Sequence, residues 1–512
     1  MKNPTITRRD FIKFLGAAGL ASLGFPLLDA VDADHSQGGR SLPNVLILVF
    51  DALSAADMSL YGYSRPTTPN FENFAQRSTV FHRHYSAGSF TTPGTASLLT
   101  GVLPWAHRAI NLQGTTSNRY QAENLFSFLP QEYYDFAYTH NSLAQVLLDQ
   151  FKPSIETLYE ISHLALFSNV WAEKPPLSEF RVPFEAELLS TQNFNSINSS
   201  LLLSFLDEVQ RRANSQGLLE RYRKEFPRGL PNCHLAGRDN TLCFTLEAAI
   251  DWITNQFDQA SKPFLGYVHL FPPHAPYNPR REFINAFNDQ PASVTKPEHH
   301  FNQGESPKQL TRMRRKYDEY IAYVDAEFGR LIDLLEREKA LESTLLIVTS
   351  DHGEIFERGV SGHNTEILYQ PLIHIPLLIS TPRQSTRIDV HSPTSAIDVV
   401  PTILGFLNSS RETQLEGQPL SLDAKAPAFE RDLFVVEAKS SPKNGKLNKA
   451  TFAIISKNYK LIYYRGYAGF DGIYELYDLD LDPQELENLY SPANSVAQEL
   501  KEKLEKRIAP YI

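Results

Sequence analysis

The sequence is poor in cysteine and has no long apolar run, and these two absences exclude several classes of protein. Its 512 residues contain only two cysteines, Cys233 and Cys243, which are too few for a disulfide scaffold or a four-cysteine zinc site. No apolar segment reaches the roughly 18 residues that a membrane-spanning helix needs, so we expect no stable membrane span. The two cysteines either pair with each other or remain free thiols, and the sequence leaves both possibilities open.

Positive charge is also scarce. The chain has 49 Lys and Arg residues against 59 Asp and Glu residues, which gives a formal net charge of −10. Contacts to phosphate backbones require clustered cations, and the sequence has no block of them, so we expect no nucleic-acid partner. Hydrophobic residues make up 42% of the chain and charged residues 21%, as is usual for a globular protein.

The N-terminal segment has the features of an export signal. Arg8-Arg9 precedes a short, glycine-containing apolar stretch at 14–28, and Val31-Asp32-Ala33 offers a small-residue cleavage site. The paired arginines resemble the twin-arginine export signal. We therefore expect residues 1–33 to be a signal peptide read by the twin-arginine machinery, with a periplasmic or extracellular destination. The alternative is an amphipathic N-terminal helix with an accidental arginine pair.

The rest of the chain alternates between strand-like and helix-like segments. Nearly continuous apolar runs predict strands buried on both faces, as in a parallel sheet. The strands expected in this way are Pro43–Phe50, Phe264–Leu270, Thr344–Ser350 and Leu372–Ile379. Helical periodicity marks the segments Leu242–Phe257, Tyr317–Lys339 and Asp398–Leu407. The alternation predicts an α/β fold with a large, mostly parallel mixed sheet flanked by helices.

Composition changes suggest where the domains begin and end. We expect a catalytic domain at 40–420 with a polar insertion at about 152–241. After a boundary near Gly417–Pro427, the segment Ala450–Tyr464 alternates apolar and polar residues, and a charged helix follows at Asn494–Ile508. We therefore expect residues 425–512 to form a small C-terminal α+β subdomain.

Acidic residues stand where two of the predicted strands end. Asp51 follows the first strand, and Asp351 with His352 follows the strand that ends at Ser350. Ligands of open α/β sheets bind beyond the carboxyl ends of the strands, and carboxylates with an imidazole suit a divalent metal. For Asp51 alone, a helix N-cap is an equally good interpretation. The Asp351-His352 pair is harder to explain as a cap.

A third segment offers a nucleophile. Thr91 and Thr92 precede Pro93, a residue favoured in the first turn of a helix. A hydroxyl at a helix N-terminus lies beside backbone N–H groups that attract an anion, and metal contact would make it a nucleophile for phosphorus or sulfur. From the local sequence alone, a simple helix cap is the more common role for such a threonine.

These segments, in their order and spacing, resemble the signature segments of the sulfatase family, which belongs to the alkaline phosphatase superfamily. The segments that carry the resemblance are Asn44–Asp51, Thr91–Gly101, His269–Tyr277, Ser350–Glu354, Gly362–His363, Asp398–Leu404 and Glu475–Leu479. The resemblance implies the sulfatase fold and hydrolysis of an ester. It also implies one divalent metal ion, either Ca, Mn or Zn, with Asp51, Thr91, Asp351 and His352 as its contacts.

The chain departs from this family at the nucleophile. Aligning on Pro93 puts Thr91 where the family has a cysteine or serine that becomes formylglycine, and Thr95 where it has an arginine. Threonine cannot form this aldehyde because its Cβ carries a methyl group. Ala52 replaces a second aspartate, and Tyr138–Asn141 replaces a Lys-Trp-His segment. Phosphoryl transfer is therefore favoured over sulfuryl transfer on chemical grounds, whereas the length of the resemblance favours the sulfatase branch.

The resemblance also implies roles for five histidines. His363 and His274 are expected to be catalytic, as donors of a proton to the leaving group. His107, His269 and His140 are expected to bind the substrate, although a structural role suits His107 and His269 equally well.

Two functions of different classes remain. The first is an exported, metal-dependent hydrolase or phosphotransferase that acts through Thr91 on a small-molecule, glycan or lipid ester. The second is a catalytically silent member of the family that binds an anionic glycan or lipid headgroup. The presence of Asp51, Thr91, Asp351 and His352 favours the enzyme.

Overall fold

Eight strands form the main sheet of the computed structural model, which describes residues 42–166, 220–231, 243–260, 263–288, 296–409, 414–422 and 431–512. In spatial order they are β11 (Ile388–Val390), β2 (Thr79–Phe81), β10 (Leu377–Ser380), β7 (Thr344–Thr349), β1 (Asn44–Phe50), β6 (Phe264–Leu270), β4 (Tyr134–Thr139) and β5 (Thr157–Leu158). Only β10 among them runs antiparallel to its neighbours. The predicted mostly parallel mixed sheet is therefore confirmed.

The central strands are buried on both faces, which explains their unbroken apolar sequences. All six residues of β7 and all seven of β6 are buried. One expected strand was wrong in part. The segment predicted at Leu372–Ile379 begins with a short helix, α12 (Gln370–Ile373), and only Leu377–Ser380 pairs in the sheet.

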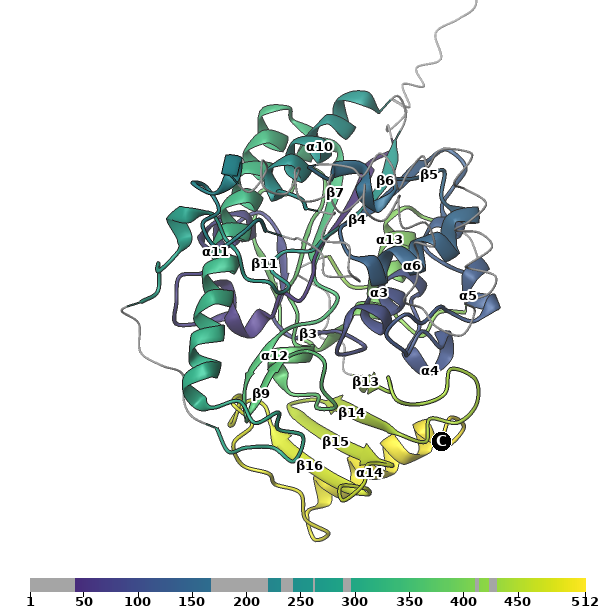
Figure 1. Cartoon of the computed structure of the whole chain (residues 1–512). Coiled ribbons are helices and arrows are strands. Elements are labelled where there is room, and N and C mark those ends of the chain that lie inside the picture. Colours follow the sequence, from purple (N-terminus) through teal and green to yellow (C-terminus); the bar gives the residue numbers. More distant parts are fainter. Residues whose placement is uncertain are drawn as a thin grey trace, which may run out of the picture. The chain divides into compact units, whose positions relative to one another are not determined.

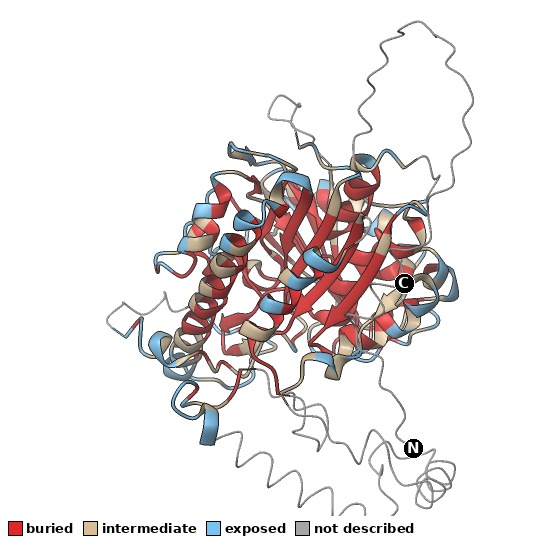
Figure 2. Ribbon diagram, turned by 90° about the horizontal axis from the view of Figure 1, so that it is seen from above, coloured by how far each residue is buried: buried red, intermediate tan, exposed pale blue. Residues whose placement is uncertain are grey.

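Helices cover both faces of the sheet (Figure 1). On one face lie α2 (Pro69–Ala75), α10 (Leu246–Gln259) and α11 (Pro307–Arg337), and their apolar residues share a core with Leu46, Leu48 and Phe50 of β1. On the other face lie α3 (Thr91–Thr100), α6 (Ser142–Phe151) and α13 (Val399–Phe406), packed on Val45, Ile47 and Val49. Figure 2 shows the result as a buried sheet between two helical layers.

A second, antiparallel sheet follows near the C-terminus. Its order is β13 (Leu433–Glu437), β14 (Ala450–Ser456), β15 (Tyr459–Arg465) and β16 (Ile473–Asp478), and α14 (Ser495–Ile508) packs on one face of it. The predicted C-terminal α+β unit is present. It is part of one compact unit that extends from Leu42 to Ile512.

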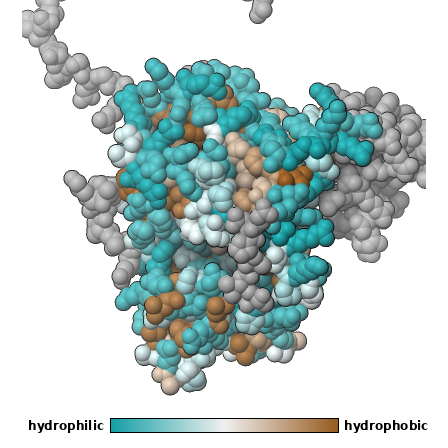
Figure 3. Space-filling model, turned by 90° about the vertical axis from the view of Figure 1, so that its left-hand side faces the viewer, coloured by the Kyte–Doolittle hydropathy of each residue, from teal (hydrophilic) through white to brown (hydrophobic). Residues whose placement is uncertain are grey.

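The described chain also contains shorter elements. Among them are α4 (Pro104–His107), α5 (Asn118–Ala122), the pair β3 (His84–Tyr85) and β12 (Thr394–Ser395), and the hairpin β8 (Ile355–Glu357) and β9 (Val360–Gly362). No helix among the described residues is long and apolar enough to cross a membrane. Hydrophilic residues cover most of the face drawn in Figure 3, and hydrophobic ones form separate patches.

Some expectations fall outside the described residues. The expected signal peptide at 1–33 lies outside them, as does most of the insertion expected at 152–241. The start of that range is not an insertion, because Thr157–Leu158 is the edge strand β5 of the main sheet. The sequence left open whether the two cysteines pair; Cys243 is disulfide-bonded, and Cys233 is not among the described residues.

Candidate active site

The register of four neighbouring strands places polar side chains in one row at the edge of the sheet. Val49 of β1 pairs with Thr349 of β7 and with His269 of β6, and His269 pairs in turn with Thr139 of β4. Two residues beyond these positions stand Asp51, Asp351 and Asn141, and carboxyl ends of parallel strands share one edge. Residues far apart in the sequence, namely 51, 141, 269 and 351, thus meet at this edge.

Asp51, Asp351 and His352 form a buried group that fits one metal ion, and we call these three residues the metal group. One ligand atom from each lies within 4.8 Å of the other two, which matches ligands placed about 2.0–2.6 Å from a common ion. All three side chains are fully buried. Oδ1 of Asp51 and Oδ2 of Asp351 have no hydrogen-bond partner among the described residues. Two buried carboxylates with orphaned oxygens call for a cation, so these residues fit the expected metal.

Two backbone N–H groups fix the orientation of the Asp351 carboxylate. Oδ1 of Asp351 accepts from the N–H groups of Ala52 (3.2 Å) and His352 (3.0 Å), which leaves Oδ2 for the cluster. Ala52 also adopts a left-handed backbone, with φ of 60°. The residue that replaces the family's second aspartate therefore contributes through its main chain.

The environment of His352 selects its tautomer. Its Nδ1 lies 2.9 Å from the carbonyl oxygen of Gly353, to which it donates, so the Nε2 lone pair of the neutral ring faces the cluster. Nε2 lies 3.4 Å from Oδ1 of Asp51 and 3.6 Å from Oδ2 of Asp351. Burial alone would lower the pKa of His352, but the carboxylates of Asp351 and Asp51 raise it to about 9. The raised pKa of His352 shows that the two carboxylates stabilise a positive charge at this position.

Thr91 is the first residue of α3 and lies against the cluster. We expected this helix to begin near Pro93, but it begins two residues earlier, with Phe90 as its N-cap. The Thr91 Oγ1 lies 3.4 Å from Nε2 of His352. The close approach of α3 depends on Gly94, because a Cβ there would lie only 2.2 Å from the Asp351 carbonyl oxygen. The helix N-terminus can therefore press directly on the loop that carries Asp351.

Thr92 and Ser89 carry the other two candidate hydroxyls near the nucleophile position, and neither has a described contact with the metal group. Thr92 donates its hydroxyl to the carbonyl oxygen of Leu112 at 2.8 Å. The hydroxyl of Ser89 is buried without a hydrogen-bond partner among the described residues, and no described contact joins it to the metal group. Only Thr91 of the three has a described contact to that group.

Asn141 was not predicted as a site residue, although it lies at the centre of the site. It follows β4 and caps α6, and its Nδ2 donates to Oδ2 of Asp51 and, at 3.2 Å, to Oγ1 of Thr91. Locally, an asparagine between a strand and a helix indicates only a cap. The only available signal was that Asn141 follows a strand, β4, which the structure places beside β6.

His363 and His274 lie together beside the metal group. The ring centroid of His363 is 4.4 Å from that of His352 and 4.8 Å from that of His274. Nδ1 of His363 lies 3.0 Å from Oε1 of Glu354, a buried carboxylate that was not predicted as a site residue. Burial opposes the charged form of Glu354, but His363, His274 and His352 hold its pKa below the usual value. Glu354 therefore orients the imidazole that we expected to be catalytic.

His269 lies beside the metal group. Its Nε2 lies 3.4 Å from Oδ2 of Asp51 and 3.7 Å from Oδ2 of Asp351, and the side chain is fully buried. Its Nδ1 lies 3.1 Å from the hydroxyl of Tyr267. The structure thus places the ring among the carboxylates, and its expected contact with a substrate stays a prediction.

His107 and His140 do not face an open site either. Both ring nitrogens of His107 are used, since Nδ1 accepts from Ala109 N–H at 3.0 Å and Nε2 lies 2.9 Å from the hydroxyl of Ser97. Burial lowers the pKa of His107 to about 3. His140 is also fully buried, with its ring 4.4 Å from Phe244. Both rings therefore contact the surrounding protein, and their expected contacts with a substrate stay predictions.

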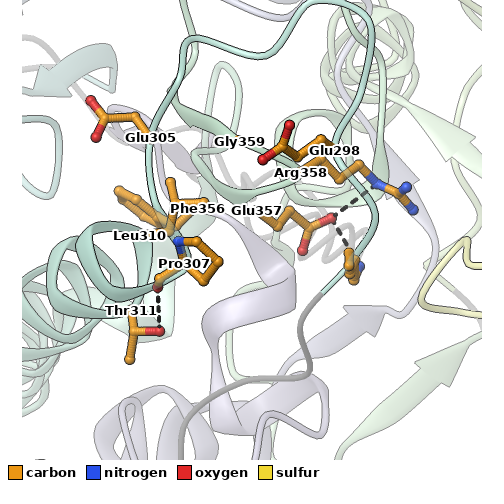
Figure 4. Close-up of a pocket in the computed structure, with 10 residues that line it drawn as sticks. Glu298, Glu305, Pro307, Leu310, Thr311, Phe356, Glu357, Arg358 and Gly359 are labelled. Carbon is orange, nitrogen blue, oxygen red and sulfur yellow. Dashed lines mark hydrogen bonds and ion pairs between the residues drawn. The ribbon is translucent and has the colours of Figure 1, made fainter.

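Cavities among the described residues lie elsewhere. One of about 630 Å³ is lined by Tyr61, Arg65, Arg83, Arg314 and His374, among others. Another, of about 40 Å³, lies beside the start of α11 and is lined in part by Glu357, which pairs with Lys296 and Arg358 (Figure 4). Neither is lined by any residue of the metal group. A large cavity is the usual first guess for a site, but the chemistry here lies in the buried group at the sheet edge.

Comparison with known proteins gives one consistent family. A model described as "Sulfatase" matches residues 43–409, and one described as "N-sulphoglucosamine sulphohydrolase, C-terminal" matches residues 362–510. The chain is 24% identical over 478 residues to choline-sulfatase of Rhizobium meliloti (strain 1021), a match covering 87% of this chain and 82% of that protein. It is 26% identical over 343 residues to N-acetylgalactosamine-6-sulfatase of Canis lupus familiaris, covering 66% of this chain and 53% of that protein.

A solved structure supports the same fold. The crystal structure of phosphonate monoester hydrolase of Agrobacterium radiobacter matches with a TM-score of 0.66 and 20% sequence identity, covering 92% of this chain and 96% of that one. Identity at this level is evidence of a shared fold and not of a shared reaction. Against the canine relative, the matched part spans about half of the relative's length.

Proposed function

Because the chain belongs to the sulfatase family, we propose that it is a metal-dependent hydrolase or transferase of phosphate, phosphonate or sulfate esters, with Thr91 as its nucleophile. The observation that carries this proposal is the position of Thr91 Oγ1 at the first residue of α3, 3.4 Å from Nε2 of His352. The named relatives include both sulfatases and a phosphonate monoester hydrolase, so the family tolerates more than one ester. We expect the substrate to be a small molecule or a glycan.

The residues that would hold the metal are those of the buried group. A divalent cation held by Asp51, Asp351 and His352, with Thr91 beside it, would act as a Lewis acid on the transferred group and on the Thr91 hydroxyl. Carboxylates with an imidazole suit Ca, Mn or Zn, and the set does not choose among them.

The helix N-terminus is suited to bind the oxygens of the transferred group. The first-turn N–H groups of Thr91 and Thr92 have no partner within α3, and Pro93 lacks an N–H group. Two backbone donors therefore remain beside the Thr91 hydroxyl. Donors placed there stabilise the negative charge that builds up on phosphoryl or sulfuryl oxygens during transfer.

The proposed reaction has two balanced steps. The Thr91 oxygen forms a bond to phosphorus, the bond to the leaving oxygen breaks, and that oxygen takes a proton from His363 while the Thr91 proton passes to solvent. Water then attacks phosphorus and gives one proton to His363, the bond from phosphorus to Oγ1 of Thr91 breaks, and Oγ1 takes back a proton from solvent. The contact of Glu354 with Nδ1 supports His363 as the proton carrier, because it leaves Nε2 for the leaving oxygen.

Phosphorus is favoured over sulfur by the nucleophile itself. A sulfated formylglycine hydrate can eliminate sulfate, whereas a sulfated threonine has no such route and must be attacked at sulfur. A phosphorylated threonine can be hydrolysed or can pass its group to an alcohol. We therefore rank phosphate and phosphonate esters above sulfate esters as substrates.

One experiment tests the nucleophile and the substrate class together. Purified enzyme, loaded with Mn²⁺, Zn²⁺ or Ca²⁺ in turn, is assayed with an aryl phosphate, a bis-aryl phosphodiester, an aryl phosphonate and an aryl sulfate. We expect Thr91→Ala to lower turnover by at least about a thousand-fold and Thr92→Ala to lower it by less than about ten-fold. Rapid quenching and mass spectrometry should find phosphate on the Thr91 peptide of the wild type.

Two results would contradict the proposal. Full activity of Thr91→Ala would rule out the covalent route through this residue. The absence of turnover with every ester and every metal, in a folded protein that still binds phosphate, would instead favour the catalytically silent binding protein.

A further inference from the structure

Asn141 has contacts that go beyond those of a helix cap. Its Oδ1 accepts from the N–H groups of Leu143 (2.7 Å) and Ala144 (3.3 Å), and this fixes which end of the amide is oxygen. The NH₂ group must therefore point the other way. It points to Oδ2 of Asp51 and to Oγ1 of Thr91.

These contacts use the whole amide. An asparagine NH₂ group has two hydrogens, and Asp51 and Thr91 account for both. The side chain is 2% exposed, so solvent does not compete for either bond. α6 thus holds the amide rigidly, and the amide in turn holds the oxygen of Thr91.

We propose that Asn141 is a positioning residue for Thr91, an inference that rests on the proposed function. An amide N–H donates and cannot take a proton, so Asn141 does not activate Thr91 as a base. The hydrogen bond from Asn141 occupies one lone pair of Oγ1 and fixes the position of this oxygen beside His352. When the hydroxyl loses its proton, Oγ1 gains the further lone pair that attacks phosphorus.

The same hydrogen bond matters more in the second step than in the first. When water attacks the phosphorylated threonine, Oγ1 is the leaving atom and gains negative charge as its bond to phosphorus breaks. A fixed N–H donor stabilises that charge. In the first step the same donor withdraws charge from the attacking oxygen. Asn141 therefore speeds hydrolysis of the phosphorylated Thr91 more than its formation.

The chain contains a matched control for the capping role. Asn494 caps α14 in the same way, with its side chain accepting from the N–H groups of Val496 (3.0 Å) and Ala497 (3.1 Å). It has no contact with the residues of the site. Serine preserves an N-cap oxygen at either position but has no amide donor.

The test compares Asn141→Ser with Asn494→Ser in the metal-loaded enzyme. We expect both variants to unfold at temperatures close to that of the wild type. Only Asn141→Ser should lower turnover, by about ten- to a hundred-fold, and only it should raise the steady-state fraction of phosphorylated Thr91. A purely structural role for Asn141 would leave that fraction unchanged. If Asn141→Ser does not fold, Asn141→Asp keeps the cap and also removes the donor.

Two further measurements separate this inference from its premises. Calorimetric titration with the metal should show less than a ten-fold change in affinity for Asn141→Ser; a larger loss that accounts for the lower turnover would overturn the inference, because Asn141 would then act through Asp51. In the Thr91→Ala background, Asn141→Ser should lower the residual turnover no further. Full activity of Thr91→Ala would defeat the proposed function, whereas an inactive Thr91→Ala with a fully active Asn141→Ser would defeat this inference alone.

Discussion

Two buried aspartates in the loop that follows β1 face opposite kinds of surroundings. Asp51 faces two imidazoles, with His269 and His352 each at 3.4 Å, and a second carboxylate, Asp351. Asp57 faces the guanidinium group of Arg314 at 3.4 Å. Although burial opposes its charged form, the pKa of Asp51 is held well below the usual value by His274, His269 and His352, whereas burial raises the pKa of Asp57.

The residues around Asp57 balance their charges within the protein. Arg65 pairs with Asp318, Arg314 lies 3.6 Å from Glu357, and Lys296 lies 2.9 Å from Glu357. We call these six residues the Asp57 cluster: Asp57, Asp318, Glu357, Arg65, Arg314 and Lys296. Three carboxylates meet three side chains that keep their positive charge, so the cluster needs no further ion.

The comparison teaches how to recognise a metal site among buried acids. The titratable side chains that face the two carboxylates of the metal group are histidines, which are neutral near pH 7 unless their surroundings charge them. Both regions leave carboxylate oxygens without hydrogen bonds among the described residues, including both oxygens of Asp57. The Asp57 cluster, however, contains three Arg or Lys side chains, whereas the metal group contains none. Burial of acids is common to both, so the balance of fixed charge and not burial distinguishes a binding site from a structural cluster.

The largest expected effect comes from removing a carboxylate of the metal group. Asp351→Asn should lower turnover by about a thousand-fold or more, because a Lewis-acid contribution of several kcal/mol is lost with the metal. It should also abolish the rise in melting temperature that added Mn²⁺ or Zn²⁺ produces in the wild type. Metal content and thermal unfolding measure both effects, with Asp389→Asn as a control at a more exposed carboxylate. If Asp351→Asn bound the metal as tightly as the wild type does, the contrast between the metal group and the Asp57 cluster would be wrong.

A comparable change in the Asp57 cluster should affect stability and not chemistry. Arg314→Met leaves Asp57 buried without its cation, and we expect a loss of about 3–5 kcal/mol in the free energy of unfolding. Turnover per folded molecule should stay within about two-fold of the wild type. Urea unfolding and an assay below the transition measure the two quantities. Arg119→Met, which breaks an exposed pair with Glu123, should cost less than about 1 kcal/mol. If Arg314→Met lowered metal affinity instead, the two regions would not be independent.

The smallest effect concerns His107, a buried histidine that forms no ion pair with the described residues. Burial lowers the pKa of His107 to about 3, below its ordinary value of 6.5. Between these values the unfolded chain binds a proton that the folded chain does not, so the free energy of unfolding should fall as the pH drops from about 6.5 towards 3. One such group contributes at most about 1.4 kcal/mol per pH unit. His107→Gln should flatten this dependence in urea titrations at pH 7.5, 6 and 5. If His107→Gln left the pH dependence of the free energy of unfolding unchanged and weakened substrate binding, the result would support the expected role of His107 in substrate binding.

The strand ends show how far the sequence could be interpreted without the structure. Asp51 and the Asp351-His352 pair were found because each follows a continuous apolar run, and such runs are typical of central parallel strands. The contact between Glu354 and His363 could not be predicted in this way. They flank the β8–β9 hairpin, in which Ile355 pairs with Gly362, and that pairing is what brings the carboxylate to the imidazole.

The histidines show what the sequence interpretation left open. His269 and His107 occur in segments that resemble family motifs, and a motif indicates that a residue lies near the site without showing what it contacts. The contacts depend on the packing around each ring. His107 spends both nitrogens on Ser97 and Ala109, and His269 lies against the carboxylates of Asp51 and Asp351.

By itself, the sequence determined the α/β class and pointed to the residues of the metal group, because periodicity and residue type carry that information locally. Only the resemblance to the family placed Thr91 at the nucleophile position, since the local pattern favoured a helix cap. The tertiary structure alone decided that Asn141 meets Thr91 and Asp51, and that α3 begins at Thr91 and presses on Asp351 across Gly94. These contacts depend on the register of β4, β6, β1 and β7. Register is set by long-range packing of the strands and helices, so no local pattern in the chain encodes it.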